Sequence, residues 1–203
     1  MKFRCEREAL EKALAIAGRA VSSRGGSLPV LSGVHLELNG NQLQLTGSDL
    51  DLTISVTMDV AGDTDGVAVL PAKLAADIVR AVADGKIELG VSDDEAHISA
   101  GRSEFSLRVI PADEFPQIAG PSAEAVELDA GVFKDALRQV IPAASSDDSR
   151  PILTGVLMAA EEGGLRLVAT DSYRLSVRDL PGSTVLGSEQ SVLVPSRSLN
   201  ELA

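Results

Sequence analysis

The sequence predicts an α+β fold in which helices pack on antiparallel sheets. Two segments repeat apolar residues at helical spacing, several short segments alternate apolar and polar residues, and an Asn-Gly pair separates two of these alternating segments. The chain has 203 residues, which is enough for one large domain or two small ones, each with its own core. We therefore expect helices and short strands to alternate along the chain.

The first part of the chain predicts a helix and a hairpin. Residues 6–22 place Leu10, Leu14 and Ala17 at helical spacing, with charged residues on the opposite face. The hairpin follows, because the segments 36–38 and 43–45 are apolar at every second position and flank Asn39-Gly40-Asn41. A further strand is predicted from Leu50 to Met58, where apolar and polar residues alternate.

The next part predicts a second helix and three more strands. A turn is expected at 62–66, and Pro71 then begins a helix in which Leu74, Ile78 and Val82 face inward. The three strands are expected at residues 86–91, 95–100 and 103–110. Residues 111–124 contain three prolines and few apolar residues, so they are predicted to be a linker.

Composition excludes several classes of protein. No apolar run approaches the ~20 residues that cross a bilayer, and the charged amino terminus is unlike a secretory signal. Cys5 is the only cysteine, which excludes an internal disulfide, suits the cytoplasm and leaves too few Cys and His residues for a metal cage. We expect no metal, no cofactor and no membrane partner. With one Tyr and no Trp, stacking on single-stranded bases is also excluded.

Charge is distributed unevenly along the chain. The net charge of −12 argues against an ordinary nucleic-acid binder, because phosphate contacts need Lys and Arg. Residues 1–24 nevertheless hold six basic groups and three acidic ones, a local charge of +3, which leaves −15 for the remainder. Positive charge is therefore concentrated at one end.

The chain contains an internal repeat. The segment LPVLSGV at 28–34 recurs as RPILTGV at 150–156, and LQLTGSD at 43–49 recurs as LRLVATD at 165–171. Three weaker matches, including Pro71 with Pro195, keep the same order and an offset of 122 to 124 residues. The two halves are therefore predicted to share a fold. An offset of 124 aligns residue 203 with residue 79, inside the second helix of the first copy, so we expect the chain to be a fragment of a longer protein.

Several segments resemble the bacterial sliding clamp family, the beta subunits of DNA polymerase III. They are MKFRCEREAL, SLPVLSGVHLEL, LTGSDLDLTISV, AGRSEFSLRVIPADEFP and LRLVATDSYRL. The resemblance covers the whole chain. It implies tandem DNA-clamp domains, each with two helices packed on antiparallel sheets. Residues 1–120 would be the first domain and 121–203 an incomplete second one. A third domain would be absent, since three copies need about 370 residues.

The resemblance implies a non-catalytic processivity factor that closes into a homodimeric ring around duplex DNA. Basic residues facing the hole would contact phosphates without reading sequence, which permits sliding. The residues expected to contact DNA are Arg7, Lys12, Arg19, Arg24, Lys73, Arg80, Lys134, Arg138 and Arg197. When the helices are considered without the resemblance, a solvated face with pairs such as Glu8–Lys12 explains the same charges.

Two further sites are implied by the resemblance. A pocket for short peptides of the replicative polymerase and the clamp loader would use Leu153, Thr170, Ser172, Tyr173, Arg174 and Leu175. Its other half lies in the family's third domain, and relatives often carry His at the position of Tyr173. The family's protomer interface would use Phe105 and Leu107. Alternatively, Tyr173 and Leu175 belong to the core.

Two other functions remain to be weighed. Asp49-Leu50-Asp51-Leu52-Thr53 imitates the DxDxT signature of haloacid-dehalogenase-type phosphatases, in which Asp49 would be the nucleophile and Asp51 the acid/base. The second copy keeps the first aspartate, as Asp171, but has Tyr173 in place of the second. This pattern favours turn-stabilising aspartates over a catalytic pair. The other alternative is an acidic binding module that never contacts DNA.

Overall fold

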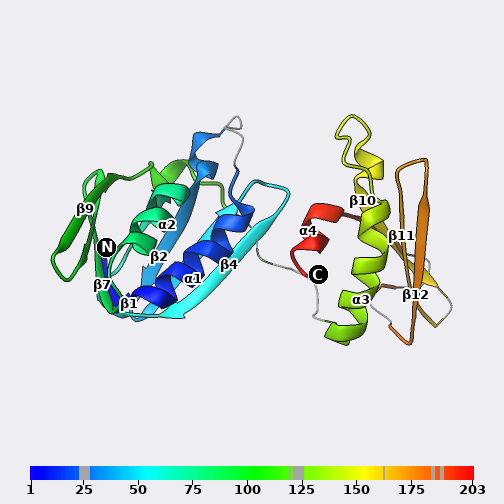
Figure 1. Cartoon of the computed structure of the whole chain (residues 1–203), viewed down its shortest axis with the longest axis horizontal. Coiled ribbons are helices and arrows are strands. Elements are labelled where there is room, and N and C mark those ends of the chain that lie inside the picture. The colour runs from blue at the N-terminus through cyan, green and yellow to red at the C-terminus, as the bar shows by residue number, and fades with distance from the viewer. Residues whose placement is uncertain (23–27, 119, 121–125, 162, 184–185, 188–189) are drawn as a thin grey trace. The chain divides into compact units, whose positions relative to one another are not determined.

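The computed structural model in Figure 1 describes residues 1–22, 28–118, 120, 126–161, 163–183, 186–187 and 190–203. These residues form helices and antiparallel sheets, which confirms the α+β prediction. The chain divides into two compact units, Met1–Ala119 and Gly120–Ala203.

The first unit contains two sheets and two helices. One sheet has the strand order β5 (Ala61–Thr64), β1 (Lys2–Glu6), β7 (Lys86–Ser92), β8 (Glu95–Ala100) and β9 (Ser103–Arg108). The other has the order β4 (Thr53–Asp59), β3 (Gln42–Ser48), β2 (Gly33–Asn39) and β6 (Gly66–Pro71). The helices α1 (Arg7–Ala17) and α2 (Ala72–Ala81) lie side by side and share one apolar core with both sheets (Figure 1).

The second unit has one sheet and two helices. Its strand order is β12 (Leu175–Pro181), β11 (Gly164–Thr170), β10 (Gly155–Glu161) and β13 (Ser191–Pro195). The helix α3 (Ala130–Val140) and the short helix α4 (Ser196–Asn200) pack on it around Leu137, Leu165 and Leu167. The carboxylate of Asp129 begins α3 by accepting a hydrogen bond from the amide of Val132 at 2.8 Å.

The four-stranded sheets of the two units are copies of one arrangement. In the first unit β2 pairs with β6 so that Gly33 faces Pro71, and in the second β10 pairs with β13 so that Gly155 faces Pro195. A short 3₁₀ helix precedes the central strand in each copy, η2 (Pro29–Ser32) and η5 (Pro151–Leu153). The structure therefore agrees with the repeat found in the sequence.

Several predicted elements are confirmed and others are wrong. The hairpin around Gly40 forms with the expected positive φ of 58°, and β7 to β9 lie where three strands were predicted. The first helix ends at Ala17 and continues only as the 3₁₀ turn η1 (Gly18–Ala20). The turn predicted at 62–66 is wrong, because residues 61–64 form β5, which pairs with β1.

Two apolar residues do not lie where periodicity predicted. Leu74 is 49% exposed, because α2 buries Ala75, Ile78 and Val79 instead. Leu50 is not part of a strand, since β4 begins at Thr53 and Leu50 lies in the preceding turn with a φ of 78°. Both errors come from residues at the ends of elements, where the local period changes.

The segment expected to be a linker begins with ordered structure. Residues 112–114 of this segment form the 3₁₀ turn η3 (Ala112–Glu114). A separate 3₁₀ turn, η4 (Ile141–Ala143), follows α3 in the second unit. Ile110, Ala112 and Phe115 pack against Val30 and its buried neighbours in the first unit. The stretch from 110 to 115 is thus part of the first unit's structure.

Candidate functional site

The exposed faces of α1 and α2 carry three of the six DNA contacts predicted for the first unit. The two helices run antiparallel, since the amide of Arg7 at the start of α1 donates to the carbonyl oxygen of Gly85, just after α2, at 2.8 Å. Lys73 and Arg80 are exposed on α2, and Lys12 is exposed on α1. Arg19 is exposed in η1, and Arg24 lies outside the described residues.

Arg7 is held in an ion-pair network. Its guanidinium lies 2.7 Å from the carboxylate of Glu11 and 2.6 Å from that of Asp84, and its side chain is only 16% exposed. Glu11 also lies 3.8 Å from Arg80, so this carboxylate joins α1 to α2. The contacts give Arg7 a structural role that the sequence did not reveal.

Lys12 and Glu8 form the exposed pair that helical spacing predicted. Their side chains are 2.7 Å apart and about equally open to solvent. The hydrogen bond between them raises the pKa of Lys12 and lowers that of Glu8. Such a solvated pair stabilises the helix weakly and leaves the ammonium group accessible to another anion.

The second unit presents basic residues on both of its helices. Lys134 and Arg138 are four residues apart on α3, and both are exposed. Arg197 is exposed on α4. The helices α2 and α3 each carry two basic residues and one acidic residue, and Arg197 is the charged residue of α4. All three helices therefore have a positive net charge, in a chain whose net charge is −12.

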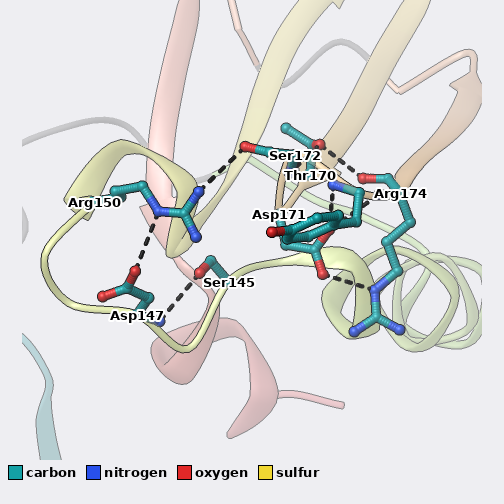
Figure 2. A network of polar contacts seen from close by, with 8 residues as sticks. Ser145, Asp147, Arg150, Thr170, Asp171, Ser172 and Arg174 are labelled. Carbon is teal, nitrogen blue, oxygen red and sulfur yellow. Dashed lines mark hydrogen bonds and ion pairs between the residues drawn. The ribbon is translucent and has the colours of Figure 1, made fainter.

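The predicted peptide-contact residues gather at the turn between β11 and β12. The Asp171 carboxylate accepts hydrogen bonds from the amides of Tyr173 and Arg174, both at 3.0 Å, and its second oxygen lies 2.9 Å from the Arg174 guanidinium. These bonds, that from the Tyr173 amide foremost, lower the pKa of Asp171. Figure 2 shows the resulting network.

The same turn is closed by Thr170. Its hydroxyl donates to the carbonyl oxygen of Arg174 at 2.7 Å and accepts from the amide of Ser172 at 3.2 Å. Ser172 has a φ of 78°, a conformation that L-residues rarely adopt, and the surrounding hydrogen bonds hold it there. The backbone of this turn is consequently well defined.

The turn presents apolar side chains to solvent. Tyr173 is 93% exposed and Leu175 is 65% exposed, so the alternative that they belong to the core is wrong. Leu153 is half-buried in η5. Cavities lie in the first unit beside β1 and in the second unit beside Arg166. The structure thus shows an exposed apolar edge at the predicted site.

Arg150, which the sequence did not indicate as a site residue, contacts the 170–175 turn. Its guanidinium donates to the Ser172 hydroxyl at 3.4 Å and to the carboxylate of Asp147 at 3.2 Å, which brings η5 and the 170–175 turn together (Figure 2). Asp147 in turn accepts hydrogen bonds from the hydroxyl and amide of Ser149, which lower its pKa. The signal was available, because Arg150 begins the repeated segment in which the first copy has Leu28.

Asp49 occupies the same position in the first unit. Its carboxylate accepts hydrogen bonds from the amides of Asp51 and Leu52 at 3.2 and 2.8 Å. The expectation that Asp49 and Asp171 stabilise turns is therefore confirmed. The phosphatase interpretation finds no support here, because the proposed nucleophile is part of a turn that recurs without the second aspartate.

The residues predicted for the protomer interface lie on β9, an edge strand of the five-stranded sheet. Phe105 is 38% exposed, whereas Leu107 is buried in the core of the first unit. The outer edge of β9 thus offers backbone amides and carbonyls for pairing, and the strand also carries one large exposed apolar side chain, that of Phe105.

The remaining candidate groups have structural surroundings. Burial raises the pKa of the Cys5 thiol to about 12, which makes it a poor nucleophile. The His35 ring lies 4.8 Å from that of Phe115, and burial lowers its pKa. Within the described part of the chain, no group of three His, Cys, Asp or Glu residues is arranged to hold a metal ion, and no helix is long and apolar enough to cross a membrane.

Comparison with protein families places both units in one family. Residues 1–119 match the N-terminal domain of the DNA polymerase III beta subunit, and residues 127–203 match its central domain. The whole chain is 37% identical to the beta sliding clamp of Synechococcus elongatus and 32% identical to that of Streptomyces coelicolor, covering 55% and 54% of their lengths. The chain thus spans about half the length of the curated relatives it matches.

Solved structures show the same similarity. The DNA polymerase III subunit beta of Pseudomonas aeruginosa aligns with all of this chain at a TM-score of 0.90 and 31% identity, over 56% of its own length. The Helicobacter pylori beta clamp, solved with a bound DNA ligase peptide, aligns with all of this chain at a TM-score of 0.87 and 28% identity, over 58% of its own length.

Proposed function

Because this chain belongs to the DNA polymerase III beta subunit family, we propose that it forms part of a sliding clamp that encircles duplex DNA and tethers a replicative polymerase. Its repeated fold and the positive charge of α2, α3 and α4 support this proposal. A closed ring would also need the part of the relatives that this chain does not span. The first and second units would supply the first and central domains of each protomer, in the cytoplasm.

The observation that carries the proposal is the charge on the helices. An exposed face that carries Lys73 and Arg80, or Lys134 and Arg138, attracts phosphates without presenting groups shaped for base edges. Such contacts are independent of sequence and weaken as salt rises. Weak contact allows sliding, and closure of the ring supplies the retention.

Arg7 is the least suitable of the proposed DNA contacts. Two carboxylates already neutralise its guanidinium, and most of its side chain is buried. We assign it the role of fixing α1 beside α2, while the exposed Lys12, Lys73 and Arg80 provide the first unit's contacts. These residues, together with Arg19, Lys134, Arg138 and Arg197, form the proposed DNA-facing set.

The experiment uses a completed protein, in which residues 1–203 are joined to the part of the Synechococcus elongatus clamp that they do not span. Loading on duplex DNA is measured at increasing salt for this protein and for its Lys134→Gln/Arg138→Gln variant. Affinity falls as salt rises, and each lost phosphate contact makes the negative slope of log affinity against log salt less steep by about 0.9. The matched control is Lys86→Gln, in the five-stranded sheet at the start of β7. Equal loading of the double variant and the control would contradict the proposal.

The 170–175 turn would form half of a site for linear peptide segments of the polymerase, the clamp loader or DNA ligase. The support is an exposed apolar pair, Tyr173 and Leu175, on a turn whose backbone is fixed by Asp171. In the completed protein, Leu175→Asp should reduce the affinity for a polymerase-tail peptide about tenfold or more. Val67→Asp, at an exposed position of the first unit, is the control. Unchanged peptide affinity for Leu175→Asp would overturn this assignment.

The edge strand β9 would pair with another protomer when the ring closes. Phe105 would pack across that interface, while the buried Leu107 would support the strand from within. Replacing Phe105 by Asp in the completed protein should shift it from dimer to monomer in sedimentation, and a dimer of unchanged stability would contradict the assignment.

A further inference from the structure

Two exposed cations of α1 and α2 lie beside carboxylates of their own helices. The Lys12 ammonium is 2.7 Å from the carboxylate of Glu8, and the Arg80 guanidinium is 3.3 Å from that of Asp77. The partners are four residues apart in α1 and three apart in α2. A phosphate that approaches Lys12 or Arg80 therefore meets a cation that already has an anion beside it.

Both of these ion pairs are open to solvent. The side chains of Lys12 and Glu8 are 70% and 71% exposed, and those of Arg80 and Asp77 are 63% and 53% exposed. Such pairs are weak, because water solvates each charged group almost as well when its partner leaves. Either cation therefore exchanges its carboxylate for another anion at small cost, and we name Lys12–Glu8 and Arg80–Asp77 the exchangeable pairs.

The ion pairs of Arg7 on the same helices are of a different kind. The Arg7 side chain is only 16% exposed, and the carboxylates of Glu11 and Asp84 lie 2.7 and 2.6 Å from its guanidinium. A largely buried cation that loses its partners is left uncompensated in the protein, which is costly. Arg7 is therefore fixed by its carboxylates, whereas the cations of the exchangeable pairs are free to move.

A carboxylate is chemically suited to replace a phosphate beside these cations. Both anions accept charge-assisted hydrogen bonds from ammonium and guanidinium groups at about 2.7–2.9 Å. The 2.7 Å separation of Lys12 and Glu8 lies in this range. Residues four apart on a helix have Cβ atoms about 5–6 Å apart, so Lys12 reaches Glu8 by rotation about its own side-chain bonds. The ammonium group thus has an anion within reach whenever it leaves a phosphate.

We propose that Glu8 and Asp77 hold Lys12 and Arg80 between successive phosphate contacts and thereby lower the resistance to sliding along DNA. This inference rests on the DNA-facing role proposed above for α1 and α2. When a phosphate contact breaks, an ion pair forms in its place, so the energy of the complex varies less as the protein moves. Glu8 and Asp77 are positioning residues, because they act on DNA through the two cations.

Two simpler roles of Glu8 have to be separated from this one. Glu8 lies in the first turn of α1, where a negative charge interacts favourably with the helix dipole. That role alone predicts a change in stability and no change in movement along DNA. The carboxylate also repels DNA at long range, but any surface carboxylate shares this effect, and it does not require Lys12. A double-mutant cycle with Lys12 therefore isolates the proposed role.

The test measures the one-dimensional diffusion coefficient of the completed protein, which is loaded on stretched duplex DNA and followed by single-molecule fluorescence. Glu8→Gln should lower this coefficient about twofold, because Lys12 loses its alternative partner and stays longer on each phosphate. Glu8→Gln should have no effect in a Lys12→Gln background and its full effect in a Lys73→Gln background. The matched control is Asp94→Asn, in the exposed turn between β7 and β8, which should leave the coefficient unchanged.

The second exchangeable pair gives an independent check. Asp77→Asn should slow diffusion less than Glu8→Gln does, because Glu11 lies 3.8 Å from Arg80 and remains as another partner. This effect should disappear in an Arg80→Gln background. Slowing by Asp77→Asn that persists in that background would contradict the role assigned to Asp77.

Three results would overturn the inference and leave the proposed function standing. They are an unchanged diffusion coefficient for Glu8→Gln, an effect of Glu8→Gln that is equally large in the Lys12→Gln background, and equal slowing by Asp94→Asn. In each case the completed protein still encircles DNA. Failure of the completed protein to stay on circular DNA would instead contradict the proposed function, and this inference with it.

Discussion

Asp49 and Asp171 cap the same turn in the two halves of the chain, 122 residues apart. Each carboxylate accepts hydrogen bonds from the backbone amides two and three residues later. The intervening residues Leu50 and Ser172 share a φ of 78°. Agreement in such an uncommon backbone conformation shows that duplication preserved local geometry as well as strand order.

Replacing either aspartate should destabilise its own unit. Asp171→Ala removes both acceptor bonds that hold the turn, so we expect the melting temperature of the second unit to fall by a few degrees. Asp49→Ala should do the same to the first unit. Calorimetry of the full chain measures both changes. Asp171→Asn is the control because its amide oxygen keeps one acceptor, and a loss equal to that of alanine would contradict this role.

The stability contributed by Asp171 should depend on pH. Its pKa in the folded chain lies below the ordinary value of 3.8, so the folded state favours the charged form. The contribution is complete above that value and is lost as pH falls through the lower, folded pKa. The melting-temperature gap between the chain and Asp171→Asn should therefore shrink below pH 3.8. Ser172→Ala, which removes no carboxylate, should show a gap that does not follow this titration.

Arg7 should act on stability more than Lys12 does. Arg7→Gln removes two ion pairs from a side chain that is 16% exposed, and about 1–2 kcal/mol of unfolding free energy should be lost. Lys12→Gln removes one fully exposed pair and should leave the free energy of unfolding almost unchanged. Urea unfolding at constant ionic strength compares them. Equal losses would show that the Arg7 network contributes no more than a surface pair.

Phe115 should stabilise the first unit alone. Truncating this half-buried side chain to alanine uncovers Val30 and Val69 and should cost about 2 kcal/mol. Ile118→Ala, at an exposed position three residues later, should change little. In calorimetry the transition of the second unit should stay in place for both variants. A shift of that transition by Phe115→Ala would contradict the assignment of this segment to the first unit.

Sequence reasoning succeeded where one period governs a whole element. The Asn39-Gly40 hairpin and the strands β7 to β9 follow from alternation and turn chemistry alone. It failed where tertiary pairing overrides local signals. Residues 61–64 look like a turn because Gly62 is followed by polar residues, but β1 provides an edge with which they pair.

The candidate sites were predictable to a similar extent. Periodicity correctly predicted the exposed basic residues of α2, and the repeat indicated the turns at Asp49 and Asp171. The burial of Arg7 was not predictable, because Asp84 reaches it from a distant loop. Arg150 was missed although the repeat marks its position, because its partner Ser172 lies on another element.

Retention on circular DNA tests the proposed encirclement most directly. The completed protein, loaded on a nicked circular duplex, should stay with the DNA through gel filtration at moderate salt and leave once a restriction enzyme linearises the duplex. Such topology-dependent loss follows from a ring that holds DNA without tight contact. Retention that is equal on circular and linear DNA, or absent from both, would contradict the account.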